Sequence, residues 1–194
     1  MELCKNWNEV TIKQFVELQK IKDDDQVESH LKIIAILSGK DKDEVERLSL
    51  DEIRQLVPYT KFIYHLPVND NLPVRVEING CDYEINYNIT CLLGSGYIDL
   101  KTYTKDPGKI WDNMHHIIAL FTSRVERKWF RWVKSDVKCP ADDILNLFPV
   151  GLAVPMALFF WTLYNNSIGR IQEYTIEKSQ NQLKNLAKSL QRVL

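Results

Sequence analysis

Hydrophobic and polar residues alternate over residues 73–88, on both sides of an Asn-Gly pair. Valines and an isoleucine occupy every second position of the first run, and two tyrosines and an isoleucine do so in the second. Such alternation is typical of strands with one buried face. Asn79 and Gly80 supply the two positive-φ positions that a type I′ turn requires. The sequence therefore predicts an antiparallel β-hairpin at residues 73–88.

Helical periodicity dominates residues 1–65. Thr11 and Gln14 form a capping box, which predicts a helix from Ile12 to about residue 21. A second apolar stripe over residues 26–38 stops at a glycine, a residue that commonly ends helices. These patterns predict an N-terminal helical block.

A second helical block is expected over residues 107–194. The segment 144–164 is the most apolar part of the chain, but Pro149 and Pro155 interrupt it, so it predicts a buried core helix and no stable membrane span. Before it, one helix has an apolar face that should enter the core. That face consists of Ile110, Met114, Ile117, Ile118 and Phe121.

Residues 124–134 combine basic and aromatic residues at helical spacing. This spacing predicts a helix with a cationic face opposite a face of Val125, Trp129 and Trp132. Such a helix can bind a phosphate backbone, a lipid head-group layer or an acidic partner, or its tryptophans can simply fill the core. The candidate contact residues are Arg124, Arg127, Lys128, Arg131 and Lys134.

The C-terminal segment, about residues 168–194, has apolar residues at the three- and four-residue spacing of a helix seam. We expect a long helix that docks on its own domain, on another copy or on another protein. The candidate assembly seam consists of Leu183, Leu186, Leu190 and Val193.

Length and charge place these elements in one domain of the α+β class. A chain of 194 residues can bury about 70% of the surface that it exposes when unfolded. The net charge is −1, but residues 121–194 carry 11 basic and 6 acidic side chains. This last part could face nucleic acid, an acidic partner or the acidic first third of a neighbouring copy.

Residues capable of metal or acid–base chemistry are scattered. The four cysteines lie far apart without C-x-x-C spacing, which favours reduced thiols. His115 and His116 are adjacent on a predicted helix and point about 100° apart, so we expect one at the core edge, one exposed and neither as a metal ligand. Gly94 and Gly96 are expected in a turn, because no third glycine or lysine completes a phosphate-binding motif. We therefore expect no metal, no cofactor and no catalytic site.

Six short segments follow one another in a characteristic order. They are residues 7–15 (WNEVTIKQF), 33–39 (IIAILSG), the acidic stretch 45–56, 76–83 (VEINGCDY), 97–100 (YIDL) and 159–161 (FFW). Their order resembles that of small virion-associated proteins of tailed bacteriophages, of the crAss-like type. The resemblance implies a non-enzymatic structural or packaged (cargo) protein that assembles with other virion proteins and with copies of itself.

The same resemblance implies location in the virion after assembly in the host cytoplasm. A phage tail-assembly chaperone is the first alternative, although the extended basic C-terminal segment departs from a minimal chaperone. The second alternative is a regulator that binds nucleic acid through the basic residues of 124–134.

Overall fold

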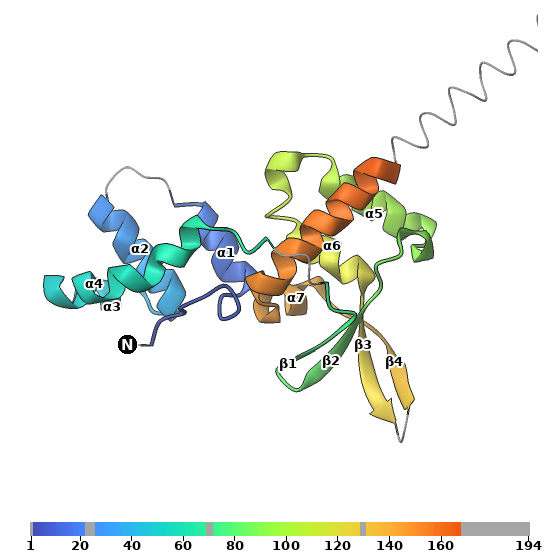
Figure 1. The fold of residues 1–194 in the computed structure, drawn as a ribbon, viewed down its shortest axis with the longest axis horizontal. Coiled ribbons are helices and arrows are strands. Elements are labelled where there is room, and N and C mark those ends of the chain that lie inside the picture. The colour runs from blue at the N-terminus through green and yellow to red at the C-terminus, as the bar shows by residue number, and fades with distance from the viewer. Residues whose placement is uncertain (1, 22–25, 69–71, 129–130, 168–194) are drawn as a thin grey trace, which may run out of the picture.

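The computed structural model describes residues 2–21, 26–68, 72–128 and 131–167. It shows an α+β fold, as the sequence predicted. The sheet between the helical segments has four described strands, twice as many as the predicted hairpin. The two hairpins of the sheet project from one side of the helical body (Figure 1).

The N-terminal helices begin at the predicted caps. Helix α1 (Ile12–Gln19) has a complete capping box, in which Thr11 accepts from the Gln14 backbone and Gln14 accepts from the Thr11 backbone. Helix α2 (Gln26–Ser38) has the predicted bounds, and Gly39 follows with φ of 65°. The block continues with α3 (Lys42–Glu46), α4 (Leu50–Leu56) and the 3-10 helix η1 (Val57–Tyr64).

The described sheet has the order β1-β2-β3-β4, with antiparallel neighbours throughout. The predicted hairpin is confirmed, since Asn79 and Gly80 have φ of 51° and 72° between the first two strands. The second hairpin occupies residues for which the sequence pattern predicted a helix. The four strands are β1 (Arg75–Ile78), β2 (Cys81–Ile85), β3 (Thr122–Lys128) and β4 (Arg131–Lys138).

Between the two hairpins the chain is helical. Gly94 and Gly96 lie in the first turn of α5, so the expectation of a turn there was wrong. All five residues of the core face predicted for 110–121 are buried. The elements of this stretch are η2 (Ile89–Cys91), α5 (Gly94–Thr104), η3 (Pro107–Lys109) and α6 (Met114–Phe121).

After the sheet come α7 (Ala141–Leu147) and a helix over residues 150–167. Phe148 and Pro149 separate them, as Pro149 predicted, whereas Pro155 lies inside the second helix and does not interrupt it. Val150 N–H donates to the Val10 carbonyl at 2.8 Å. None of the described helices is long and apolar enough to cross a membrane.

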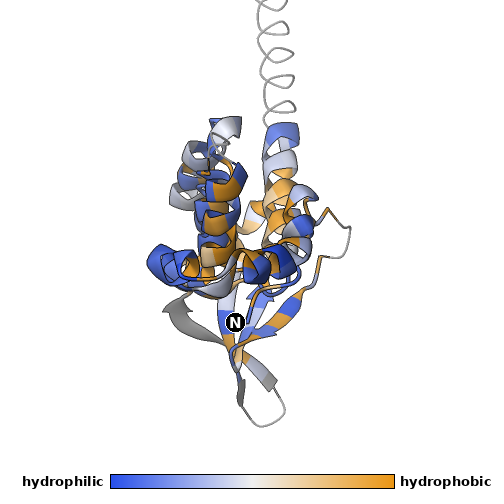
Figure 2. Cartoon of the chain, turned by 90° about the vertical axis from the view of Figure 1, so that its left-hand side faces the viewer, coloured by the Kyte–Doolittle hydropathy of each residue, from blue (hydrophilic) through white to orange (hydrophobic). Residues whose placement is uncertain are grey.

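One cluster of buried side chains draws on both helical blocks and on the sheet. Phe121 and Phe160 stack with ring centroids 3.8 Å apart, and Tyr83 of the sheet meets Phe148 edge to face at 5.3 Å. Figure 2 shows that the helices are hydrophobic on one side and hydrophilic on the other. The apolar faces therefore pack against the sheet and against one another.

Candidate partner-binding surface

The basic segment forms most of the β3–β4 hairpin and not the predicted helix. Strand β3 follows α6 directly, and Thr122 Oγ1 donates to the Ile118 carbonyl at 2.8 Å at the junction. Residues 122–128 form a strand because they pair with β2, which the first hairpin alone would leave as an unpaired edge. Burial alternates accordingly, since Val125 is buried between exposed Arg124 and Glu126.

The hairpin also divides the residues that were predicted to share one cationic face. Register pairs Arg127 with Trp132, Lys128 with Arg131, and Val125 with Lys134. Successive positions of a strand alternate between the two sides of the sheet. The predicted cationic helix face is therefore not formed, because Arg124, Arg127 and Lys128 lie on β3 whereas Arg131 and Lys134 lie on β4.

A contact between the first and last strands was not anticipated from the sequence. The Arg75 guanidinium of β1 lies over the Trp132 ring of β4, 4.3 Å from its centroid. Arg75 also pairs with Glu84 of β2 at 3.4 Å. The alternation of β1 gave a signal for Arg75, because it predicted that its side chain points away from the valines.

Apolar side chains remain exposed on this part of the molecule. Trp132 and Val133 are 39% and 41% exposed on β4, and Val74 just before β1 is 64% exposed. We call Arg75, Glu84 and Trp132 the sheet surface, because the register places all three on one side of the sheet, whereas Val133 leaves the opposite side. The sheet surface combines charge with exposed apolar area, which is the composition of a protein-binding surface.

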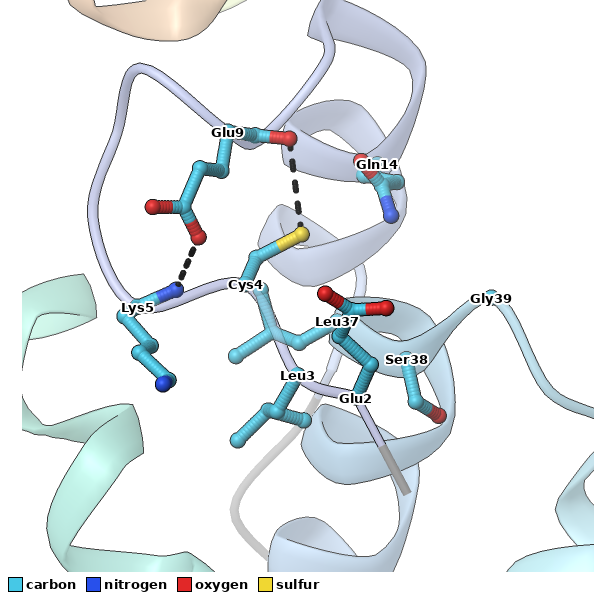
Figure 3. A pocket seen from close by; sticks show the side chains of 9 residues that line it. All are labelled: Glu2, Leu3, Cys4, Lys5, Glu9, Gln14, Leu37, Ser38 and Gly39. Atoms are coloured by element: carbon cyan, nitrogen blue, oxygen red, sulfur yellow. Dashed lines mark hydrogen bonds between the residues drawn. The ribbon is translucent and has the colours of Figure 1, made fainter.

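An open depression of about 490 Å³ lies between the N-terminal segment and the end of α2 (Figure 3). Within it the Cys4 thiol donates to the Glu9 carbonyl at 3.4 Å, and the Lys5 backbone donates to the Glu9 carboxylate at 2.8 Å. Burial, and secondarily the Glu9 charge, raises the pKa of Cys4 above its usual value. Cys4 is therefore a protonated thiol near neutral pH and lacks the activation of a nucleophilic cysteine.

The two adjacent histidines are packed into the fold. Burial and the neighbouring His116 lower the pKa of His115 to about 4, although Asp142 and Asp112 act in the opposite direction. The His116 ring stacks on Tyr103 with centroids 4.7 Å apart, so the expectation of one exposed histidine was wrong. Among the described residues, no group of His, Cys, Asp and Glu is arranged to hold a metal ion.

The predicted assembly seam, Leu183 to Val193, lies outside the described residues. A scan against protein-family models found no match, and neither did the searches of curated proteins and of solved structures.

Proposed function

We propose that this chain is a non-enzymatic structural or packaged protein of a tailed-bacteriophage particle and that it acts by binding other proteins of the particle. The observation that carries the proposal is the sheet surface. Trp132 is 39% exposed on β4, and the Arg75 guanidinium lies over its ring, 4.3 Å from the centroid. Aromatic residues and arginine are enriched in protein–protein interfaces.

The phage assignment is supported by the order of the six sequence segments. Residues 76–83, one of these segments, form the β1–β2 hairpin. Residues 159–161, another of them, place Phe160 in the core against Phe121. Two of the segments thus contribute half of the described strands of the sheet and part of the core beneath it.

Nucleic-acid binding is the second candidate function, and one observation favours it. Strands β3 and β4 (residues 122–128 and 131–138) carry six basic and two acidic side chains and pair as a β-ribbon, an element that fits a groove or follows a phosphate backbone. Binding of this kind weakens steeply with added salt, whereas binding through apolar contacts does not. A salt titration with a labelled DNA duplex and a single strand distinguishes the two functions.

The sheet surface can be tested during particle assembly. A phage lacking the gene would be complemented with the wild-type chain, with a Glu84→Ala/Trp132→Ala variant, or with Val27→Ala as a control exposed elsewhere at 57%. We expect the double variant to be made and folded but depleted from particles, while the control is incorporated normally. Normal incorporation of the double variant would overturn the role of this surface.

A tail-assembly chaperone is the remaining alternative. Such a protein would bind its partner during assembly and then leave. It would be abundant in infected cells but absent from finished particles, and the fractionation of the complemented lysate reports this directly.

A further inference from the structure

Strand β1 forms an edge of the described sheet, with β2 on one side only (Figure 1). Ile85 N–H donates to the Val74 carbonyl at 2.8 Å, which identifies Val74 and Ile85 as a hydrogen-bonded pair of the antiparallel ladder. Because such pairs alternate with non-bonded pairs, Val76 and Ile78 also direct their peptide groups at β2. The N–H and C=O groups of Arg75 and Glu77 therefore point outward from the sheet.

The side chains of this edge are sorted in the same alternating way. Val74 is 64% exposed, and Val76 and Ile78 are half-buried on the same side of the strand. Arg75 and Glu77 are exposed and occupy the other side. The edge thus offers an apolar row on one side and one basic and one acidic residue, two positions apart, on the other.

We propose that β1 is a homodimer interface, in which two copies of this chain pair antiparallel along β1 about a two-fold axis at Val76. This register places Arg75 opposite Glu77 of the second copy, and Glu77 opposite Arg75 of the second copy. In both pairs the N–H and C=O groups point outward from the sheet. Each pair exchanges two N–H···O=C bonds, so the interface contains four. The two sheets then continue as one.

Charge and apolar complementarity select this register. Each outward pair joins opposite charges, which is favourable for residues directly opposite in a sheet. On the other side, Val76 meets Val76 of the second copy and Val74 meets Ile78 of the second copy. The exposed Val74 is thereby covered.

The neighbouring two-fold registers are poorer. An axis at Glu77 brings two glutamates directly opposite each other, and an axis at Arg75 brings two arginines together. The axis at Arg75 also sets Glu77 against Pro73, which has no N–H to donate. The axis at Val76 is therefore the self-complementary choice, and a two-fold interface closes without forming a fibre. The proposed dimer interface does not depend on the proposed role in a virion.

A proline at the edge tests the backbone pairing. At position 77 it removes only an outward N–H, so Glu77→Pro should preserve the β1–β2 ladder. A four-residue edge makes a small interface, so we expect the full-length wild type to dimerise with a Kd on the order of micromolar in sedimentation velocity. Glu77→Pro should weaken the dimer about tenfold or more. A wild-type monomer, or a Glu77→Pro variant that dimerises like the wild type, would overturn the interface.

Cysteine crosslinking tests the register without depending on the proline variant. Val76→Cys places a thiol directly against its own copy across the two-fold axis, whereas Val74→Cys faces Ile78 of the second copy. We expect oxidation to crosslink Val76→Cys through that position, verified by peptide mass spectrometry, with Val74→Cys and the wild-type cysteines as controls. No crosslink for Val76→Cys, or equal crosslinking of Val74→Cys, would contradict the register.

Charge exchange completes the test. Glu77→Arg alone opposes two arginines across the interface and should weaken the dimer, while Arg75→Glu/Glu77→Arg restores opposite charges and should recover it. Failure of the double variant to recover dimerisation, with an unchanged circular dichroism spectrum, would count against the pairing.

Discussion

Arg75 lies with its guanidinium 4.3 Å from the centre of the Trp132 ring, so a cation–π contact connects the first and last strands of the sheet. Contacts of this type contribute about 0.5–1 kcal/mol at exposed sites. We expect a double-mutant cycle of Arg75→Ala and Trp132→Ala, followed by urea unfolding, to give a coupling free energy of that size. In a control cycle Val133→Ala replaces Trp132→Ala, and we expect no coupling free energy between Arg75→Ala and Val133→Ala. Zero coupling between Arg75 and Trp132 would show that the contact is not formed in solution.

Gly80 is required by the turn and not by a ligand. Its φ of 72° is in the region that β-branched residues avoid. Gly80→Val should lower the free energy of unfolding by about 1–3 kcal/mol. Gly94→Val is a matched control, because Gly94 has no positive φ and no atom within 4 Å of an added Cβ. Equal melting temperatures for the two variants would show that the turn does not require a glycine at position 80.

His115 should make stability depend on pH. Its pKa is lowered from 6.5 to about 4 in the folded chain, so the unfolded chain binds more protons between those values. The contribution of neutral His115 is therefore complete above about pH 6.5 and is lost as pH falls toward about 4.

The loss should be about 1–3 kcal/mol, since partial exposure screens the effect. His115→Leu should flatten the unfolding free energy between pH 4 and 6.5, the interval set by its two pKa values. An unchanged pH profile in His115→Leu would contradict the burial-induced shift.

The predicted C-terminal seam can be tested in the full-length chain. Leu186→Glu/Leu190→Glu places charge on the apolar stripe, whereas Lys188→Glu changes charge between those positions without touching the stripe. We expect only the double variant to lose binding to particle proteins in a pull-down, with both variants retaining the wild-type melting temperature. Normal binding by the double variant would exclude a docking role for the seam.

The structural features predicted correctly have local causes. The Thr11 capping box and the Asn79-Gly80 turn depend on residues within four positions of one another, and their chemistry is specific enough to read from the sequence. Phe148 and Pro149 likewise separate two helices where a proline predicted a break.

The second hairpin could not be read in this way because its cause is not local. Arg124 and its basic neighbours fit a helical spacing, and no glycine or proline lies between α6 and β4 to mark a boundary. The segment becomes a strand because it pairs with β2, whose nearest partner residues are about 40 positions earlier in the chain. The β-branched residues Thr122, Val125, Val133 and Val137 gave a sequence signal for strands, as did the aromatic Trp132.

Quantitative mass spectrometry of gradient-purified phage particles tests the central claim most directly. The account predicts that peptides of this chain co-purify with the major capsid protein at a constant ratio across the particle peak, after nuclease treatment and a high-salt wash. Absence of the chain from such particles, in a lysate where it is abundant, would contradict a structural or packaged role.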